Sequence, residues 1–201
     1  MSRRDEVLQA ALDLLDEVGL DGLTTRKLAD RLGVRAGALY RHFDSKQALL
    51  DAMVEHIAAG GRNTPPTSDD WDDRLAALAF AMRDGMLTRR DGARLVATMH
   101  VPGPAAVAEF DRMIGSLVSA GATNAVAATA TDTVFAYVNG FTIEEQARKS
   151  GRIGREQLDR EFRAGLKLII NGVRAAIEAA EHEEKPLDGD PVERLRRTAT
   201  P

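Results

Sequence analysis

The sequence contains no cysteine among its 201 residues. This absence excludes a disulfide framework, a thiolate zinc site, an iron–sulfur cluster and a cysteine nucleophile. It also fits a protein that stays in a reducing cytoplasm. Any catalytic or metal chemistry would have to rest on other side chains.

Long apolar runs are also lacking. The longest uncharged run, Met113–Thr131, contains two glycines and several hydroxyl residues, and Arg112 and Asp132 border it. A membrane span would be more apolar and uninterrupted. The residues after the charged N-terminus are amphipathic and do not form the continuous apolar block of an export signal. We therefore expect a soluble, cytoplasmic protein without a membrane partner.

The common catalytic motifs are missing as well. There is no Walker A loop, dinucleotide glycine fingerprint or nucleophile elbow. The di-iron sites of helical bundles need Glu-x-x-His pairs, and none occurs. Asp69, Asp70, Asp72 and Asp73 would lie in the first turn of a helix capped by Ser68, where they complement the helix dipole. We expect no enzyme, no cofactor and no metal.

The charge of the chain is slightly acidic, with 27 Lys and Arg against 31 Asp and Glu, but it is unevenly distributed. Residues 1–23 hold two basic and six acidic side chains, a net charge of −4. Residues 24–47 hold six basic and two acidic side chains, a net charge of +4. A local basic patch is what phosphate binding requires, whatever the charge of the whole chain.

Helical periodicity runs through almost the whole chain, and no convincing strand is visible, so we predict an all-α fold. Thr24 and Ser45 can cap helices at their starts, and Gly19 and Gly33 stand where C-cap glycines would. On a later helix, Glu144 and Glu145 are expected to pair with Arg or Lys. The predicted helices cover residues 7–18, 25–32, 36–43, 91–99, 104–120, 123–150 and 155–184, with two more starting near 45 and 69.

Two glycines at 60–61 and two prolines at 65–66 interrupt the helical pattern and mark a domain boundary. We predict a small N-terminal module over 1–46 and a connecting helix and linker over 47–66. A larger helical domain would cover 67–184. The charged residues 185–201 would form a mobile tail.

The segment Leu23–Lys46 has the design of a helix-turn-helix, with two short helices around a turn at Gly33-Val34. Its apolar residues can form one small core: Leu28, Leu32, Val34, Leu39 and Phe43. Its remaining side chains collect on the exposed side, where hydroxyls and cations can contact phosphate and bases. These predicted DNA contacts are Thr25, Arg26, Arg35, Tyr40, Arg41, His42 and Lys46.

This segment resembles the DNA-binding domain of the TetR family, and most closely its tetracycline repressor branch. The shared motifs are GLTTRKLA at 22–29, LGV at 32–34, LY at 39–40, His42 and KxALLD at 46–51. Further echoes of that branch are Trp71, RDGAR at 90–94, Gly140 followed by IEEQ at 143–146, and GLxLIIxG at 165–172. The resemblance spans nearly the whole chain.

The resemblance implies a TetR-like fold: a three-helix DNA-binding domain followed by a larger helical domain. It implies a homodimer whose long C-terminal helices pair into a four-helix bundle, with a ligand cavity in each subunit. It also implies that ligand binding tilts the helix linking the domains and changes the separation of the recognition helices.

The positions that read bases in the tetracycline repressor match Ala36, Gly37 and Ala38 here. Small residues can pack on thymine methyls but offer little hydrogen-bond readout. Arg26 and Arg35 are then the best candidates to read guanine, with Arg41 as a third. The operator should therefore differ from the tetracycline operator.

The ligand pocket departs further from the family pattern. The histidine that ligates the drug-bound magnesium aligns with Val96, a polar drug contact with Leu78 and an aromatic contact with Met82. Valine cannot ligate magnesium, so we expect a mostly apolar cavity with His100 and Asn139 as polar anchors. The predicted lining is Leu78, Met82, Val96, Met99, His100, Met113, Val134, Tyr137, Asn139 and Phe141.

The predicted function is a regulator that binds a palindromic double-stranded operator as a homodimer and is released by a small lipophilic effector. A helix-turn-helix activator, or a regulator without a small ligand, remains as an alternative. The sequence does not separate a repressor from an activator, since the sign depends on where the operator lies relative to the promoter.

Overall fold

The structure is a computed structural model that describes residues 2–60, 70–148 and 154–182. Within those residues the chain is helical and contains no strand, which confirms the all-α prediction. The helices are α1 (Arg3–Gly22), α2 (Thr25–Leu32), α3 (Ala36–Leu39), α4 (Lys46–Gly60), α5 (Trp71–Leu87), α6 (Gly92–Val96), α7 (Pro104–Ser119), α8 (Asn124–Ala147) and α9 (Arg155–His182).

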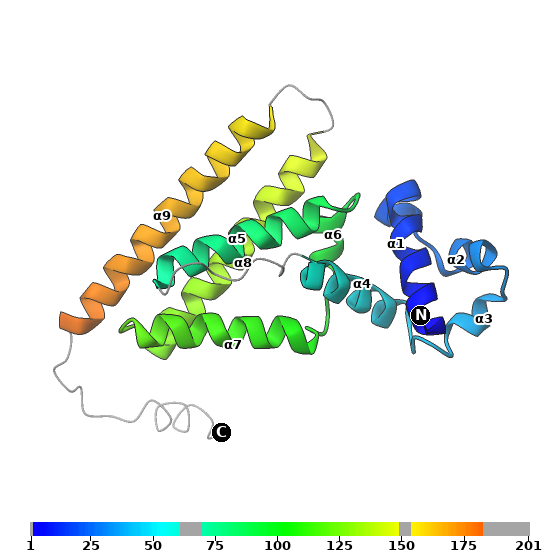
Figure 1. Ribbon diagram of the computed structural model, residues 1–201, viewed down its shortest axis with the longest axis horizontal. Coiled ribbons are helices and arrows are strands. Elements are labelled where there is room, and N and C mark those ends of the chain that lie inside the picture. The colour runs from blue at the N-terminus through cyan, green and yellow to red at the C-terminus, as the bar shows by residue number, and fades with distance from the viewer. Residues whose placement is uncertain (1, 61–69, 149–153, 183–201) are drawn as a thin grey trace, which may run out of the picture.

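Two hydrophobic cores organise these helices. The first joins α1, α2 and α3 to α4, which contributes Met53 and Ile57 among its buried residues. The second joins α5, α7, α8 and α9, and its largest buried apolar side chain is Phe162. Val96 packs against both cores, so α6 lies where they meet. In Figure 1 the first group lies at one end of the molecule and the long α8–α9 pair at the other.

The local signals for α2 act as predicted. The Thr24 hydroxyl accepts a hydrogen bond from the Lys27 N–H at 3.2 Å, and Gly33 ends the helix with φ of 66°. Ser45 likewise accepts from the Ala48 N–H at the start of α4, at 3.0 Å. These contacts satisfy backbone groups that helix ends leave open.

Gly19 does leave the helical conformation, with φ of 72°, but helical turns resume and α1 continues to Gly22. The third helix is shorter than predicted: after Leu39 the chain turns tightly, with the His42 N–H donating to the Leu39 carbonyl at 2.9 Å. The predicted Ser68 cap lies outside the described residues, and α5 begins after Asp70.

The predicted helix 91–99 is also shorter, because Asp91 lies outside α6 in a left-handed conformation with φ of 55°. Its carboxylate accepts the Leu20 N–H at 2.9 Å, a long-range contact that offsets the backbone cost of that conformation. The predicted helix 123–150 is too long, because α8 ends at Ala147 and Arg148 has left the helical conformation with ψ of 67°. The predicted end of α9 at 184 and the tail 185–201 fall outside the described residues. None of the helices in the described parts of the chain is long and apolar enough to cross a membrane.

Candidate nucleic-acid interface and effector core

The helix-turn-helix is held together by the turn after α2. The Gly33 N–H donates to the Asp30 carbonyl and the Val34 N–H to the Ala29 carbonyl, at 3.2 and 3.0 Å. Leu28 and Leu39 are then buried in the first core. As predicted, Leu32, Val34 and Phe43 pack in the same core. The small core sets the angle at which α3 leaves α2.

Most of the predicted DNA contacts lie on the surface. Thr25, Ala38 and His42 are half-buried. The exposed ones are Arg26, Arg35, Ala36, Gly37, Tyr40, Arg41 and Lys46. They come from α2, α3, the turn after it and the first residue of α4, so the fold brings them onto one module. Whether they touch DNA stays a prediction.

The cations of this module differ in their partners. Arg31 pairs with Glu17 of α1, its Nη1 lying 2.7 Å from the carboxylate. In the described parts of the chain, no carboxylate lies within ion-pair distance of Arg26, Arg35 or Arg41. These guanidinium groups are therefore available to an anionic partner, which is the state that phosphate or base recognition needs.

The acidic residues of α1 have a different use, one that sequence reasoning missed. Arg89 donates to Asp16 at 2.7 Å, and Arg94 donates to both carboxylate oxygens of Asp21, at 2.9 and 3.2 Å. The hydrogen bonds and charge of Arg94 lower the pKa of Asp21. Asp16 and Asp21 are thus paired with the corner between α5 and α6, whereas Glu17 pairs with Arg31. The RDGAR run was a signal of this contact, but its partner could not be read from it.

Gln146 joins α8 to the same corner. Its side-chain oxygen accepts the Ala93 N–H at 3.0 Å, and its nitrogen donates to the carbonyls of Arg89 and Met86 at 2.8 and 3.3 Å. One side chain therefore satisfies three backbone groups around α6. The position of α6 depends on α8 as well as on α1.

The predicted effector residues separate into two places. Met113 and Val134 are buried in the second core. The half-buried Leu78, Met82, Val96, Tyr137 and Phe141 pack against that core. Met99 packs against the first core instead. His100 is exposed after α6, where its backbone N–H donates to Asp51 of α4 at 3.0 Å and its ring Nδ1 lies 3.0 Å from the Thr98 carbonyl oxygen. The fold therefore does not bring Met99 and His100 together with the other predicted lining residues.

The two remaining polar candidates differ in their hydrogen bonds. Tyr137 donates to the Phe162 carbonyl at 2.9 Å, and burial raises the pKa of its hydroxyl. The side-chain oxygen of Asn139 is buried and has no hydrogen-bond partner within the described ranges. A buried polar atom without a partner is costly, so Asn139 is suited to anchor a ligand.

Sequence reasoning missed a buried arginine. Arg83 of α5 is 1% exposed and donates to both oxygens of Glu145 and to Asp159, at 2.8, 2.9 and 2.6 Å. Burial would lower the pKa of Arg83, but these hydrogen bonds outweigh it and raise the pKa. The sequence signal for its burial was its spacing: Arg83 follows the buried Ala79 by four residues, so both lie on the same face of α5. The expected pairing of Glu144 and Glu145 is confirmed, since Glu144 pairs with Arg148.

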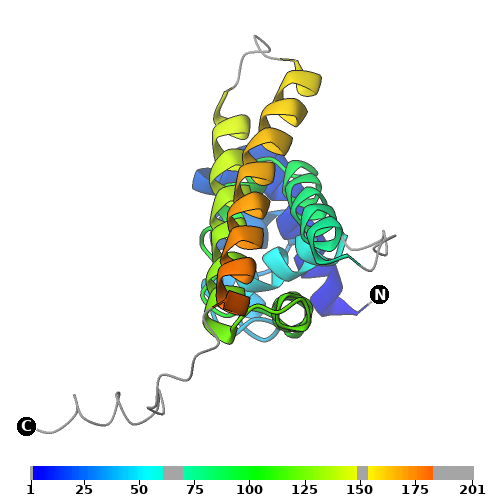
Figure 2. The same ribbon diagram turned by 90° about the vertical axis from the view of Figure 1, so that its left-hand side faces the viewer.

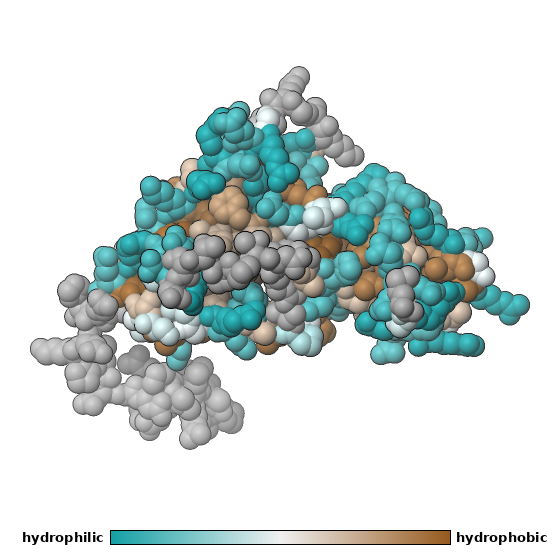
Figure 3. Space-filling model, in the orientation of Figure 1, coloured by the Kyte–Doolittle hydropathy of each residue, from teal (hydrophilic) through white to brown (hydrophobic). Residues whose placement is uncertain are grey.

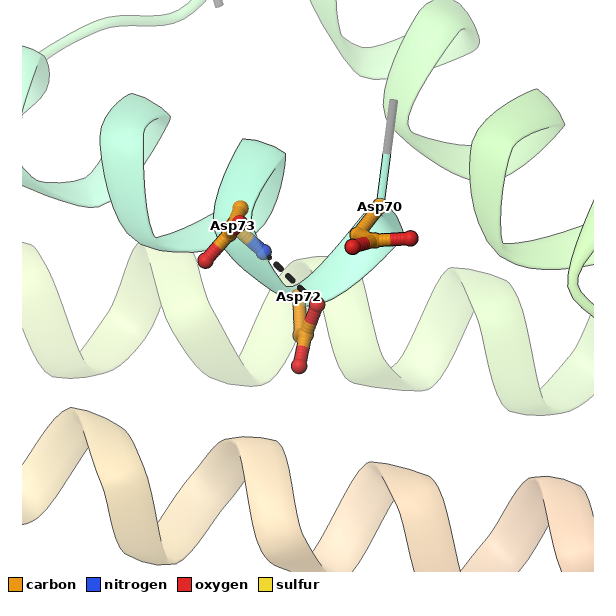
Figure 4. Close-up of side chains that lie close together, drawn as sticks. All are labelled: Asp70, Asp72 and Asp73. Atoms are coloured by element: carbon orange, nitrogen blue, oxygen red, sulfur yellow. Dashed lines mark hydrogen bonds between the residues drawn. The ribbon is translucent and has the colours of Figure 1, made fainter. Parts of the chain in front are cut away.

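The acidic start of α5 has ordinary protein partners. The carboxylates of Asp70, Asp72 and Asp73 lie within 4.8 Å of one another (Figure 4). Asp72 accepts the Asp73 N–H at 2.9 Å and forms an ion pair with Arg174 of α9. These contacts support the structural role predicted for the cluster.

An exposed helix-turn-helix joined to a second, larger helical core defines the class of one-component transcriptional regulators. Two family models match the chain: "Bacterial regulatory proteins, tetR family" over residues 7–53, and "Tetracyclin repressor-like, C-terminal domain" over residues 64–158. The chain belongs to the TetR family. It is a ligand-responsive, DNA-binding transcriptional repressor and not an enzyme.

Individual relatives agree with this assignment. The class A tetracycline repressor of Escherichia coli transposon 1721 is 36% identical, over 92% of this chain and 96% of its own length. A possible TetR family regulator from Streptomyces coelicolor A3(2) is 37% identical, with a TM-score of 0.77, covering 86% of this chain and 98% of that one. A TetR variant from Acinetobacter baumannii AYE, solved with minocycline, is 37% identical with a TM-score of 0.78, covering 87% and 98%.

Proposed function

We propose that this chain binds an inverted-repeat operator as a homodimer in the cytoplasm, and that a lipophilic effector bound without magnesium releases it. The observation that carries the DNA part is the set of exposed guanidinium groups on the helix-turn-helix, at Arg26, Arg35 and Arg41, which lack carboxylate partners among the described residues. One structural relative, 33% identical with a TM-score of 0.74 over 86% of this chain and 98% of its own, was solved with its double-stranded DNA operator.

The dimer would form through α8 and α9. These two helices run side by side at the edge of the molecule, and Figure 2 shows them facing the viewer with no described helix over them. Leu168 of α9 is 73% exposed. On the face of the molecule drawn in Figure 3, apolar patches lie among the hydrophilic residues of the half that holds α5 and α9. A second copy of the chain that packs on these helices would bury this apolar surface, as symmetric homodimers usually do.

The effector would enter the second core. Leu78 and Met82 stand where the resemblance places a polar and an aromatic drug contact, and Val96 replaces a magnesium ligand. The apolar surroundings favour a guest that gains from leaving water, and Asn139 offers one unsatisfied hydrogen-bond acceptor to orient it. Release of DNA requires only that the effector prefer a conformation that fits the operator less well.

Fluorescence anisotropy with the DNA upstream of the protein's own coding region tests the DNA part. We expect tight binding to an inverted repeat with half-sites about one helical turn apart, and weak binding to unrelated DNA of equal length. Equal affinity for both DNAs would contradict the proposal. Sedimentation tests the dimer, and a monomer at micromolar concentration would refute it.

A further inference from the structure

A cavity of about 360 Å³ lies at the junction of α1, α6 and α8, apart from the core proposed for the effector. Its lining comes from α1 (Val18, Gly19 and Asp21), from the turn before α6 (Arg90 and Asp91), from α6 (Arg94) and from α8 (Ile143, Gln146 and Ala147). Its volume is within the usual range of small-molecule sites. None of the residues predicted to line the effector pocket belongs to it.

Arg90 contributes a guanidinium group to this cavity, and the described residues use only some of its hydrogen-bond donors. Its Nη1 donates to the Glu17 carbonyl at 2.8 Å, and its backbone N–H donates to Asp16 at 2.9 Å, so both ends of the residue are held against α1. In the part of the chain that the structure describes, its Nε and Nη2 have no acceptor and no carboxylate lies within 4.0 Å of it. Arg89 and Arg94, on either side, are both paired with carboxylates.

The cavity also has apolar lining residues. Val18 and Ile143 are half-buried, and Ala147 is the last residue of α8. Gln146, which also lines the cavity, uses its amide group on the backbone around α6 and has little capacity left for a ligand. Two carboxylates also line the cavity, but both have partners: Arg94 donates to Asp21, and Asp91 accepts the Leu20 N–H and lies 3.6 Å from Arg94. Among the charged groups of the lining, Arg90 is therefore the one that keeps unused donors within the described residues, and apolar side chains share the cavity with it.

We propose that this cavity is a second ligand site, which binds a small organic carboxylate with an apolar body. The carboxylate accepts hydrogen bonds from the free donors of Arg90, a charge-assisted and geometrically matched pair. The apolar body lies against Val18, Ile143 and Ala147. α1 packs in the first core together with the helix-turn-helix, whereas α8 belongs to the second core and α6 lies where the two cores meet. The bound molecule therefore bridges the two cores and stabilises their described arrangement.

Titration calorimetry on the full chain tests the site with phenylacetate and octanoate as probes and phenylacetamide as the neutral control. We expect both carboxylates to bind and the amide not to. Arg90→Gln should weaken carboxylate binding about tenfold to a hundredfold, the loss expected for a charged hydrogen bond. Ala147→Phe should block the site by filling it, because Ala147 is exposed and tolerates a larger side chain in the fold.

Two controls separate this site from others. Arg160→Gln removes an exposed arginine of α9 whose one ion-pair partner among the described residues is Glu156, and it should leave carboxylate binding unchanged. Met82→Glu alters the proposed effector core and should also leave it unchanged, so this result is independent of the proposed function. Absence of binding at millimolar carboxylate would overturn the proposal. So would binding that survives both Arg90→Gln and Ala147→Phe, or binding that Met82→Glu removes.

Discussion

The guanidinium of Arg83 and the carboxylate of Glu145 form a two-pronged hydrogen-bonded pair between α5 and α8, at 2.8 and 2.9 Å. Arg83 is 1% exposed, and its side chain also lies 5.0 Å from the centre of the Phe162 ring. A charge in this position is tolerated because two carboxylates and an aromatic face replace its water. Because Arg83 also donates to Asp159 of α9 at 2.6 Å, this arginine joins three helices at the second core.

We therefore expect Arg83→Met to destabilise the protein by about 3–5 kcal/mol, because Glu145, whose side chain is only 10% exposed, would be left without its partner. The double variant Arg83→Met/Glu145→Leu should recover much of this loss, since no unpaired buried charge remains. Urea unfolding measures both, with Arg160→Met as a surface control. If the single and the double variant were equally stable, the unpaired charge of Glu145 would not be the cause of the destabilisation in Arg83→Met.

Gly92 has no room for a side chain. A Cβ atom there would lie 2.1 Å from the Met86 carbonyl oxygen, a backbone atom that cannot easily move. Gly92→Ala should destabilise the protein by about 1–3 kcal/mol, the usual cost of overpacking. Gly115→Ala on α7 is the matched control. Its Cβ meets nothing within 4 Å, so thermal unfolding should show it about 0.5–1 kcal/mol more stable than wild type.

We expect the predicted DNA contacts to divide into residues that read bases and residues that bind phosphate and position the protein on the DNA. Arg26→Ala and Arg35→Ala should each cost about 1–3 kcal/mol on the preferred operator and relax base preference, if these residues read guanine. Lys46→Ala should weaken all sequences alike and reduce the salt dependence, as expected for a phosphate contact. Anisotropy titrations on a set of operator variants measure the difference. If Arg26→Ala and Lys46→Ala gave the same profile, the division would be wrong.

The effector core should not need magnesium. We expect calorimetry to show no magnesium-dependent binding of tetracycline, because Val96 cannot ligate the metal. A lipophilic effector should bind and weaken operator binding, and Met82→Glu should abolish this by placing a charge in the apolar core. Tight, magnesium-dependent tetracycline binding would refute the hypothesis, and so would an effector whose affinity ignores Met82→Glu.

The contact between Asp21 and Arg94 should depend on pH. Arg94 lowers the pKa of Asp21 below its ordinary 3.8, so the contact is fully present above that value. It is lost as the pH falls through the lowered pKa. Carboxyl NMR titration should place this pKa below 3.8, and Arg94→Gln should return it toward 3.8. Asp5 serves as the control, because Ser2 lowers its pKa and Arg94→Gln should not affect it.

Local signals were enough to predict most of the helices and the DNA-binding module. The limits of α2 depend on residues close in sequence: the cap at Thr24, the left-handed turn at Gly33 and the spacing of its apolar residues. Such short-range effects can be predicted from the sequence without knowledge of the tertiary structure. The family motifs in the first quarter of the chain identified the helix-turn-helix for the same reason. The surface placement of Arg26 and Arg35 followed from that local geometry.

Contacts between distant segments could not be read in this way. Glu145 and Asp159 are 62 and 76 residues from Arg83, and Asp21 is 73 residues from Arg94. An arginine can pair with any carboxylate that the fold brings near, so its partner depends on how the helices pack. The same holds for the backbone N–H of His100, which meets Asp51 of α4, 49 residues away. The ends of α2 are decided by neighbouring residues, whereas buried charges find their partners only when distant helices assemble around one core.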